Sequence, residues 1–304
     1  MNPLLRAVVS SASRLAAFIL PTQVAIASGF AIYVADVNTG VIRQFNAAGQ
    51  GSPFGNVGLV NPVGLAIDAA GNLFVANRSG GVSGTIDRFT PDGTLSLFSS
   101  DTDFPSKLAF DASGNLYAGM VGNNTISRFN ASGQATVFAS SGLNGPIPLA
   151  FDHNGNLYVG NTGNSTIMKF GPDGQPQFFA TSGLYPYGLT FDNAGNLYVA
   201  NFGDNTIQKI DPAGHSTIFA DFGSGISAPV DIAFDGLANL YVLNLGNNTI
   251  EKFDLAGNGT WFANAGLNHP ESLAIQMVPE PGSALLPLGA AVTLLGRGLR
   301  RRSR

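Results

Sequence analysis

The chain has 304 residues, of which 39 are glycine and only 11% are charged, against about 25% charged residues in ordinary soluble domains. It has no cysteine, which excludes a disulfide framework, a thiol nucleophile and a cysteine-ligated metal. Two of the 15 basic residues precede residue 20 and five follow residue 296, so segment 28–277 holds 8 basic and 18 acidic residues, a net charge of −10. Phosphate binding requires clustered Lys and Arg, so we do not expect a nucleic-acid groove.

Residues 1–27 have the pattern of a secretory signal peptide. Arg6 and Arg14 precede the apolar run 15–20, and Ala25-Ile26-Ala27 is a small-x-small cleavage site just before the first predicted strand. The alternative is an extra helix that caps the fold.

The stretch Leu65 to Asn77 is the unit that the rest of the chain repeats. Two apolar runs flank an Asp-x-x-Gly-Asn turn, which predicts a β-hairpin because the glycine allows positive φ and the aspartate accepts from turn amides. A second hairpin follows in each copy. The asparagine of the turn recurs at intervals of 40 to 43 residues, at Asn72, Asn115, Asn156, Asn196 and Asn239. Four strands in such a period predict one blade of a β-propeller.

Five copies are complete, and the remaining segments supply a sixth. Residues 31–54 contain the second, third and fourth strands of a blade, and 272–276 match a first strand without its turn. Joining them closes a ring and removes open sheet edges. The sequence therefore predicts an all-β, six-bladed β-propeller over residues 28–277.

The blades resemble NHL repeats over residues 31–276. The pattern is carried by Gly195-Asn-Leu-Tyr-Val-Ala-Asn201, Gly203-Asp-Asn205 and Ile207-Gln-Lys-Ile210. The resemblance implies a propeller like those of the senescence-marker/gluconolactonase superfamily, and NHL-type propellers include protein-binding, RNA-binding and enzymatic members. Streptogramin lyases have similar repeats, but the His-Glu-His metal set that they imply has no counterpart in this chain.

The C-terminal segment 278–304 resembles a PEP-CTERM sorting signal. Pro279, Glu280 and Pro281 precede an uncharged run, 282–296, and an arginine-rich end. The resemblance implies export in a Gram-negative bacterium, transient insertion of 282–296 into the inner membrane, processing by an exosortase, and a final place at the cell surface or in an exopolysaccharide matrix. A permanent membrane anchor is the alternative.

Sorting the loops by topology separates the histidines. His153 and His215 belong to hairpin turns at one mouth of the ring, and His269 belongs to an inter-blade connection at the other, so all three cannot form one site. Each Asp-x-x-Gly-Asn turn offers a single carboxylate, which favours turn capping over calcium binding. The Asn-x-Thr triplets that begin at Asn123, Asn164 and Asn247 are expected to be turn chemistry as well.

The mouth that carries the inter-blade connections is the predicted site of function. Oxygen-bearing side chains end the second strand of five blades, at Asp36, Asn77, Asn161, Asn201 and Asn244. Tyr185 and Tyr187 lie on an inter-blade connection, where their rings could stack on sugars or contact a peptide, although packing between blades is an equal explanation.

A divalent ion at this mouth is the enzymatic alternative. Asp36, Asp231 and Glu271 fall on adjacent blades around the closure and would offer the hard oxygen ligands that Ca²⁺ or Mg²⁺ prefers. The resemblance to senescence-marker/gluconolactonase propellers, which hold one divalent ion in the channel through Glu, Asn and Asp, implies such roles for Asn161, Asn201, Asp231 and Glu271. The alternative set is therefore Asp36, Asn161, Asn201, Asp231 and Glu271. Solvated carboxylates of an acidic domain would give the same pattern. We therefore expect a non-catalytic binding or structural protein that requires no cofactor and has exopolysaccharide or surface proteins as partners, with a metal-dependent lactonase or lyase as the alternative.

Overall fold

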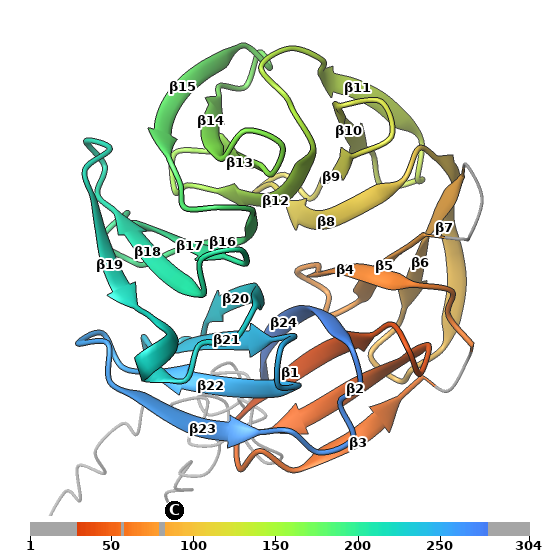
Figure 1. Ribbon diagram of the computed structural model, residues 1–304. Helices are drawn as coiled ribbons and strands as arrows, with labels where there is room; N and C mark the ends of the chain where they lie inside the picture. The colour runs from red at the N-terminus through yellow and green to blue at the C-terminus, as the bar shows by residue number, and fades with distance from the viewer. Residues whose placement is uncertain (1–28, 56–57, 79–82, 279–304) are drawn as a thin grey trace, which may run out of the picture.

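The structure, a computed structural model, describes residues 29–55, 58–78 and 83–278. It contains six four-stranded antiparallel sheets arranged as a ring (Figure 1). The six-bladed propeller predicted from the repeat is confirmed. Within the described ranges no helix is long and apolar enough to cross a membrane. The predicted signal peptide, the sorting motif Pro279 to Pro281 and the membrane segment 282–296 lie outside the described residues.

The four strands of each blade follow one another from the axis outward. Blade one is β24 (Pro270–Val278), β1 (Gly29–Asp36), β2 (Val41–Asn46) and β3 (Gly51–Phe54); blade two is β4 (Pro62–Ile67), β5 (Leu73–Asn77), β6 (Gly84–Phe89) and β7 (Leu95–Thr102); blade three is β8 (Pro105–Phe110), β9 (Leu116–Met120), β10 (Thr125–Phe129) and β11 (Ala135–Ala139). Blade four is β12 (Pro146–Phe151), β13 (Leu157–Asn161), β14 (Thr166–Phe170) and β15 (Pro176–Thr181); blade five is β16 (Pro186–Phe191), β17 (Leu197–Asn201), β18 (Thr206–Ile210) and β19 (Ser216–Ala220); blade six is β20 (Pro229–Phe234), β21 (Leu240–Asn244), β22 (Thr249–Phe253) and β23 (Gly259–Ala263).

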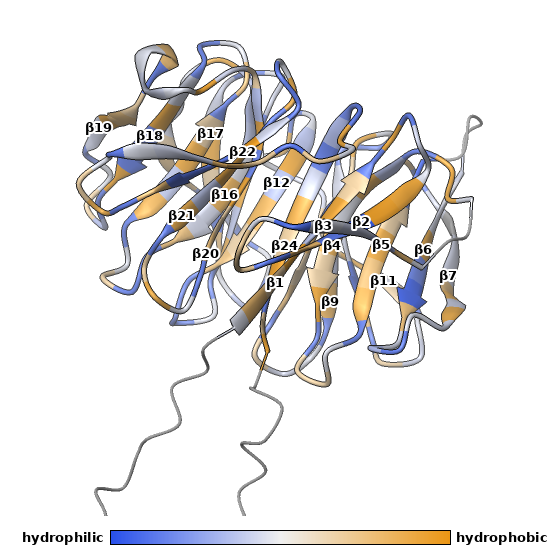
Figure 2. Cartoon of the chain, turned by 90° about the horizontal axis from the view of Figure 1, so that it is seen from below, coloured by the Kyte–Doolittle hydropathy of each residue, from blue (hydrophilic) through white to orange (hydrophobic). Residues whose placement is uncertain are grey.

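Blade one is built from both ends of the described chain, as predicted. β24 pairs antiparallel with β1, with Ile275 opposite Ile32 and Gly29 opposite Val278. The pairing is longer than the predicted 272–276 because β1 offers partners along its whole length. β1 begins and β24 ends on the same face of the ring (Figure 2).

The hairpin turns explain why the Asp-x-x-Gly-Asn pattern repeats. In blade four, Asp152 Oδ1 accepts from the backbone N–H of Asn154 and Asn156, at 2.9 and 2.8 Å, and Oδ2 accepts from Asn156 Nδ2 at 2.8 Å. Gly155 adopts φ +79°. The same contacts recur in four other blades, at Asp68, Asp111, Asp192 and Asp235. The predicted turn capping is therefore confirmed.

The threonines of the Asn-x-Thr triplets also act within their turns. Their Oγ1 atoms donate to the Oδ1 of the preceding asparagines, Asn123, Asn164 and Asn247, over 2.6 to 2.8 Å. This agrees with the turn role predicted from the sequence.

Aromatic rings fill the space between neighbouring blades. The Tyr158 ring on β13 lies edge-on to Phe179 of its own blade and to Phe191 of blade five, with centroids 4.9 Å apart in both cases. Equivalent rings pack in the other blades, and every residue of β13 is buried. The antiparallel strands give the ring two unlike faces. The hairpin face carries the Asp152-type turns, and the loop face carries the connections between blades.

Candidate functional site

The axis of the ring carries the strongest departure from the repeat. Each innermost strand begins with proline, and its third residue differs from blade to blade: Gly64, Lys107, Pro148, Gly188, Asp231 and Ser272. Two of these residues are charged, in a chain with few charges. They come from β8 of blade three and β20 of blade six, which stand opposite each other in the ring (Figure 1).

Lys107 and Asp231 form an ion pair across the axis. Lys107 Nζ lies 3.0 Å from Asp231 Oδ2, and the two side chains are 7% and 11% exposed. The lysine also donates to the backbone carbonyl of Glu271. A buried ion pair is stable only when further hydrogen bonds satisfy both partners, and the surroundings of Asp231 supply them.

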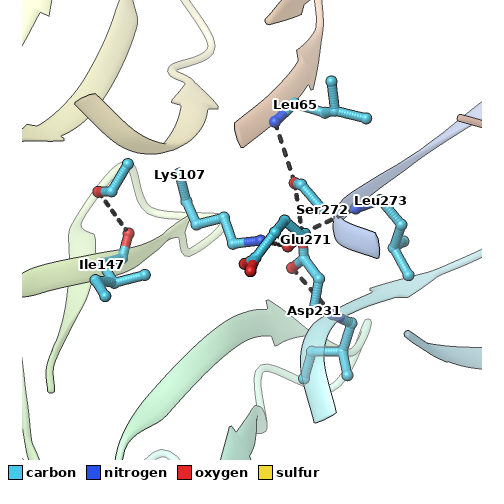
Figure 3. Close-up of polar contacts among 9 residues, drawn as sticks. Leu65, Lys107, Ile147, Asp231, Glu271, Ser272 and Leu273 are labelled. Atoms are coloured by element: carbon cyan, nitrogen blue, oxygen red, sulfur yellow. Dashed lines mark hydrogen bonds and ion pairs between the residues drawn. The ribbon is translucent and has the colours of Figure 1, made fainter. Parts of the chain in front are cut away.

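Asp231 is saturated by donors from the closing strand and from its own. Its Oδ2 accepts from Ser272 Oγ at 2.7 Å and from the backbone N–H of Leu273 at 3.0 Å, while Oδ1 accepts from the N–H of Ile232 at 3.0 Å. Ser272 Oγ in turn accepts from the N–H of Leu65 on blade two, at 3.1 Å. Figure 3 shows how Lys107 and Asp231 meet the run 271–273 of β24.

We name the Lys107–Asp231 pair, with its contacts to residues 271–273, the axial latch. Glu271, Ser272 and Leu273 are consecutive, and each offers one polar group to the latch. These are residues of the strand that closes the ring. The latch therefore ties blades three and six to that strand.

A second group of polar side chains lies on the loop side of the latch. His269 Nε2 lies 3.3 Å from Glu271 Oε1, and Arg78 Nε donates to the carbonyl of Pro105 at 3.1 Å. The Tyr187 ring lies 5.1 Å from that of Phe202. We call Arg78, Tyr187, His269 and Glu271 the mouth cluster.

The pKa values of Arg78 and Tyr187 in the mouth cluster depend on the charges of neighbouring members. Burial lowers the pKa of the Arg78 guanidinium, and the negative charge of Glu271 opposes that shift. Burial raises the pKa of Tyr187; Glu271 raises it further and Arg78 lowers it. Three blades thus contribute an acid, a cation and a phenol that lie within electrostatic reach of each other.

The five side chains that end the second strands are placed inside their own loops. Asn161 accepts from the N–H of Asn144 at 3.0 Å and donates to the carbonyl of Gly142 and to Thr166 Oγ1. Asn244 makes the equivalent contacts in blade six. All five are at most 3% exposed: Asp36, Asn77, Asn161, Asn201 and Asn244. Asp36, Asn161 and Asn244 cap loop backbone. Asn77 and Asn201 instead donate to the side chains of Thr85 and Thr206, and the Oδ1 atom of each is buried without a hydrogen-bond partner in the described structure.

The residues of the divalent-ion alternative belong to separate networks. Asp36 accepts from the N–H and Oγ1 of Thr39, Asn201 donates to Thr206 Oγ1 at 3.1 Å, and Asp231 holds the ammonium of Lys107. The carboxylate of Glu271 contacts His269, so the five residues of the predicted set are divided among separate contacts. In the described part of the chain, no group of three or more His, Asp or Glu side chains is placed to hold a metal.

The two predicted aromatic residues differ in placement. Tyr185 is 51% exposed and adopts φ +56° just before β16, whereas Tyr187 is half-buried against Phe202. Lys107 and Arg78 were not predicted from the sequence. The signal for Lys107 is a charged residue at a position where three of the other blades have Gly or Pro. The sequence pattern offers its partner Asp231 only as a metal ligand.

Taken together, the fold and the axis define a six-bladed β-propeller with a closed axis and a polar mouth on its loop face. Residues 57–275 match the model of the virginiamycin B lyase family, and the chain belongs to that family. The chain is therefore a member of a lyase family, although the sequence has no counterpart of the His-Glu-His metal set expected for streptogramin lyases. No match was found among curated proteins.

Solved structures share the fold at low identity. A structure described as a nidogen/laminin complex contains a chain 21% identical to this one, with a TM-score of 0.71, over 81% of this chain and 98% of that chain. The selenomethionine-substituted virginiamycin B lyase of Staphylococcus aureus is 18% identical, with a TM-score of 0.58, over 70% and 73%. A catalytically inactive histidine-to-alanine variant of that lyase, with quinupristin, is 17% identical, with a TM-score of 0.57, over 80% and 78%.

Proposed function

We propose that this protein is an exported, non-catalytic propeller that binds its partner at the mouth cluster, with Tyr185 at the rim. One observation carries the proposal. The exposed ring of Tyr185 and the interacting side chains of Arg78, Tyr187 and Glu271 lie on the loop side of the axial latch. Binding sites of proteins typically join an aromatic surface to a few fixed polar groups.

The chemistry of the cluster suits a saccharide. Tyr187 is supported by Phe202, so its ring is a rigid surface against which a sugar could stack. The Arg78 guanidinium has five N–H donors, one of which bonds the carbonyl of Pro105, and Glu271 and His269 offer acceptors. Paired donors and acceptors beside a ring match the hydroxyl groups of an exopolysaccharide. A surface protein is the second kind of partner expected.

The latch argues against chemistry at the axis. The carboxylate of Asp231 accepts from four donors of the chain itself, so it is already engaged as an acceptor. A carboxylate held in this way by an ammonium, a hydroxyl and two amides is a poor general base. This supports a closed floor beneath a binding surface.

The alternative is a metal-dependent lactonase or lyase. Family membership and the 3.3 Å contact between His269 and Glu271 favour it. It predicts that calorimetry detects Ca²⁺, Mg²⁺ or Zn²⁺ binding at millimolar concentration and that Glu271→Gln abolishes the signal. No heat of binding for any of the three ions would remove this alternative.

Export and sorting complete the proposal. A signal peptide over 1–27 would direct secretion, and an exosortase would process the chain near Pro279, Glu280 and Pro281. Because Gly29 pairs with Val278 at the hairpin face, a chain held by its C-terminal tail would direct the loop face, with the mouth cluster, away from the membrane. Detection of residues 290–304 in the native mature protein by mass spectrometry would contradict processing.

The binding test uses retention of the full chain on an exopolysaccharide or matrix preparation. We expect Tyr185→Ala with Tyr187→Ala to abolish retention, and Glu271→Gln to weaken it. Trp261→Ala is the matched control, since Trp261 is 62% exposed on the outermost strand of blade six, remote from the mouth. Retention that is unchanged in the tyrosine double variant would refute the proposed surface.

A further inference from the structure

An exposed apolar patch surrounds the point where the described chain ends. Met277 and Val278, at the end of β24, are 38% and 40% exposed, and Leu237 and Leu255, in the two hairpin turns of blade six, are 61% and 53% exposed. We name these four residues the exit patch. All of them lie on the hairpin face.

The first turn of blade six lies between the end of β24 and the second turn on that face. A Cβ built on Gly236 would lie 3.2 Å from the Sδ and Cε atoms of Met277, so the turn that carries Leu237 sits against the end of β24. Ala238 and Leu255 line a common groove of about 220 Å³ together with Phe191 and Phe234. Apolar side chains therefore occur from the chain exit across blade six to the border of blade five, where Asp192, Asn193 and Asp235 also line the groove.

The leucines depart from the repeat only in this blade. At the position of Leu237 the other complete turns carry Ala70, Ser113, Asn154 and Ala194. At the position of Leu255 the other blades carry Ala47, Pro91, Ala131, Pro172 and Pro212. The turn itself does not require leucine, because Asp235 and Asp254 cap their turns as the other blades do. A role other than turn formation must account for these two apolar side chains beside the end of β24.

We propose that the exit patch lies against a lipid surface. Val278 is followed within a few residues by the uncharged run 282–296 and an arginine-rich end, so the sequence leads from the patch into its expected membrane segment. A chain inserted there would bring the nearest face of the ring to the bilayer. Exposed apolar side chains of an interfacial segment enter the headgroup boundary by about 5 to 10 Å.

This inference rests on the proposed membrane insertion of the C-terminal segment and adds the ring's own contact with the bilayer. The contact is apolar rather than electrostatic, because segment 28–277 is acidic and Asp235 and Asp254 flank the leucines. Zwitterionic vesicles should therefore suffice as the lipid probe.

The absence of cysteine makes a direct test simple. Single Leu237→Cys and Leu255→Cys variants of the full chain are labelled with an environment-sensitive fluorophore and mixed with phosphatidylcholine vesicles that carry a nitroxide quencher in their lipids. Asn154→Cys and Ala131→Cys are matched controls, since they occupy the same turn positions in blades four and three. Flotation of the vesicles reports membrane insertion separately.

The expected result is flotation of all four variants, with loss of fluorescence at positions 237 and 255 only. Flotation without quenching at these positions would overturn the exit patch as a lipid contact and leave membrane insertion standing. Failure to float would overturn both. A label at position 237 or 255 that is already shielded before vesicles are added would mean that the chain's own tail or a second copy covers the patch, which also contradicts the proposal.

Discussion

Removing the lysine of the axial latch should cost more stability than any other single loss of charge in the described ring. Lys107→Met leaves the Asp231 carboxylate buried without its cation. Breaking a buried ion pair in this way typically costs about 3 to 5 kcal/mol. Asp231 keeps the donors Ser272 Oγ, the N–H of Leu273 and the N–H of Ile232, so we expect the lower end, about 3 kcal/mol.

The assay is urea unfolding followed by circular dichroism, with Lys209→Met as the control. Lys209 Nζ lies 3.8 Å from Asp192 Oδ2 and its side chain is 34% exposed, and exposed pairs of this kind contribute about 0 to 1 kcal/mol. Lys107→Met with Asp231→Asn should be more stable than Lys107→Met alone, because no uncompensated charge is then buried.

The location of the damage is a second measurement. If the latch acts on the closing strand, hydrogen exchange in Lys107→Met should accelerate first in β24 and β1, ahead of β12 and β13 in blade four. A loss of stability no greater than that of Lys209→Met, or uniform acceleration over all blades, would refute the reasoning.

Three further predictions address the closure, the turns and a buried carboxylate. Deleting residues 271–277 should open the ring and lower its melting temperature; an unchanged melting curve would contradict shared closure. Asp152→Ala removes three turn hydrogen bonds and should destabilise by about 1 to 3 kcal/mol in thermal unfolding, more than Asp173→Ala, which removes one bond to the N–H of Gln175. Burial raises the pKa of Glu251, so the native state binds this proton more tightly than the unfolded state and loses stability as pH rises through the raised pKa. Glu251→Gln should therefore be more stable than wild type at pH 7, with the difference vanishing below the ordinary glutamate pKa of about 4.3, and equal stability at both pH values would refute this.

The ring and its closure could be predicted because their signals are local and periodic. Each turn is built from an aspartate, a glycine and an asparagine within five residues, and the structure uses them within that turn, as Asp152 shows. The closing strand is recognisable because 272–276 repeat a first strand. Its observed length, Pro270–Val278, depends on pairing with β1. The sequence of the closing strand alone does not show how far that pairing extends.

The candidate site is harder to predict because side-chain direction in loops has no period. Asn161 ends an apolar strand, a position that suggests a side chain facing a ligand, but an amide offers both a donor and an acceptor, and the nearby loop backbone uses both. The latch joins residues 124 positions apart. Only the arrangement of the innermost strands around the axis shows that Lys107 and Asp231 meet.

The closing strand links the axial latch, the mouth cluster and the exit patch. Successive side chains of a strand point to opposite faces, so a slip of one residue would exchange Glu271 with Ser272 and remove the acid from the mouth cluster. The latch holds a polar group of Glu271, Ser272 and Leu273 at once, which fixes that register. Further along the same strand, Met277 and Val278 form half of the exit patch. A latch variant that still folds should therefore bind its partner more weakly even with every mouth residue intact, and a variant that loses stability while keeping full binding would separate the mouth from the closure.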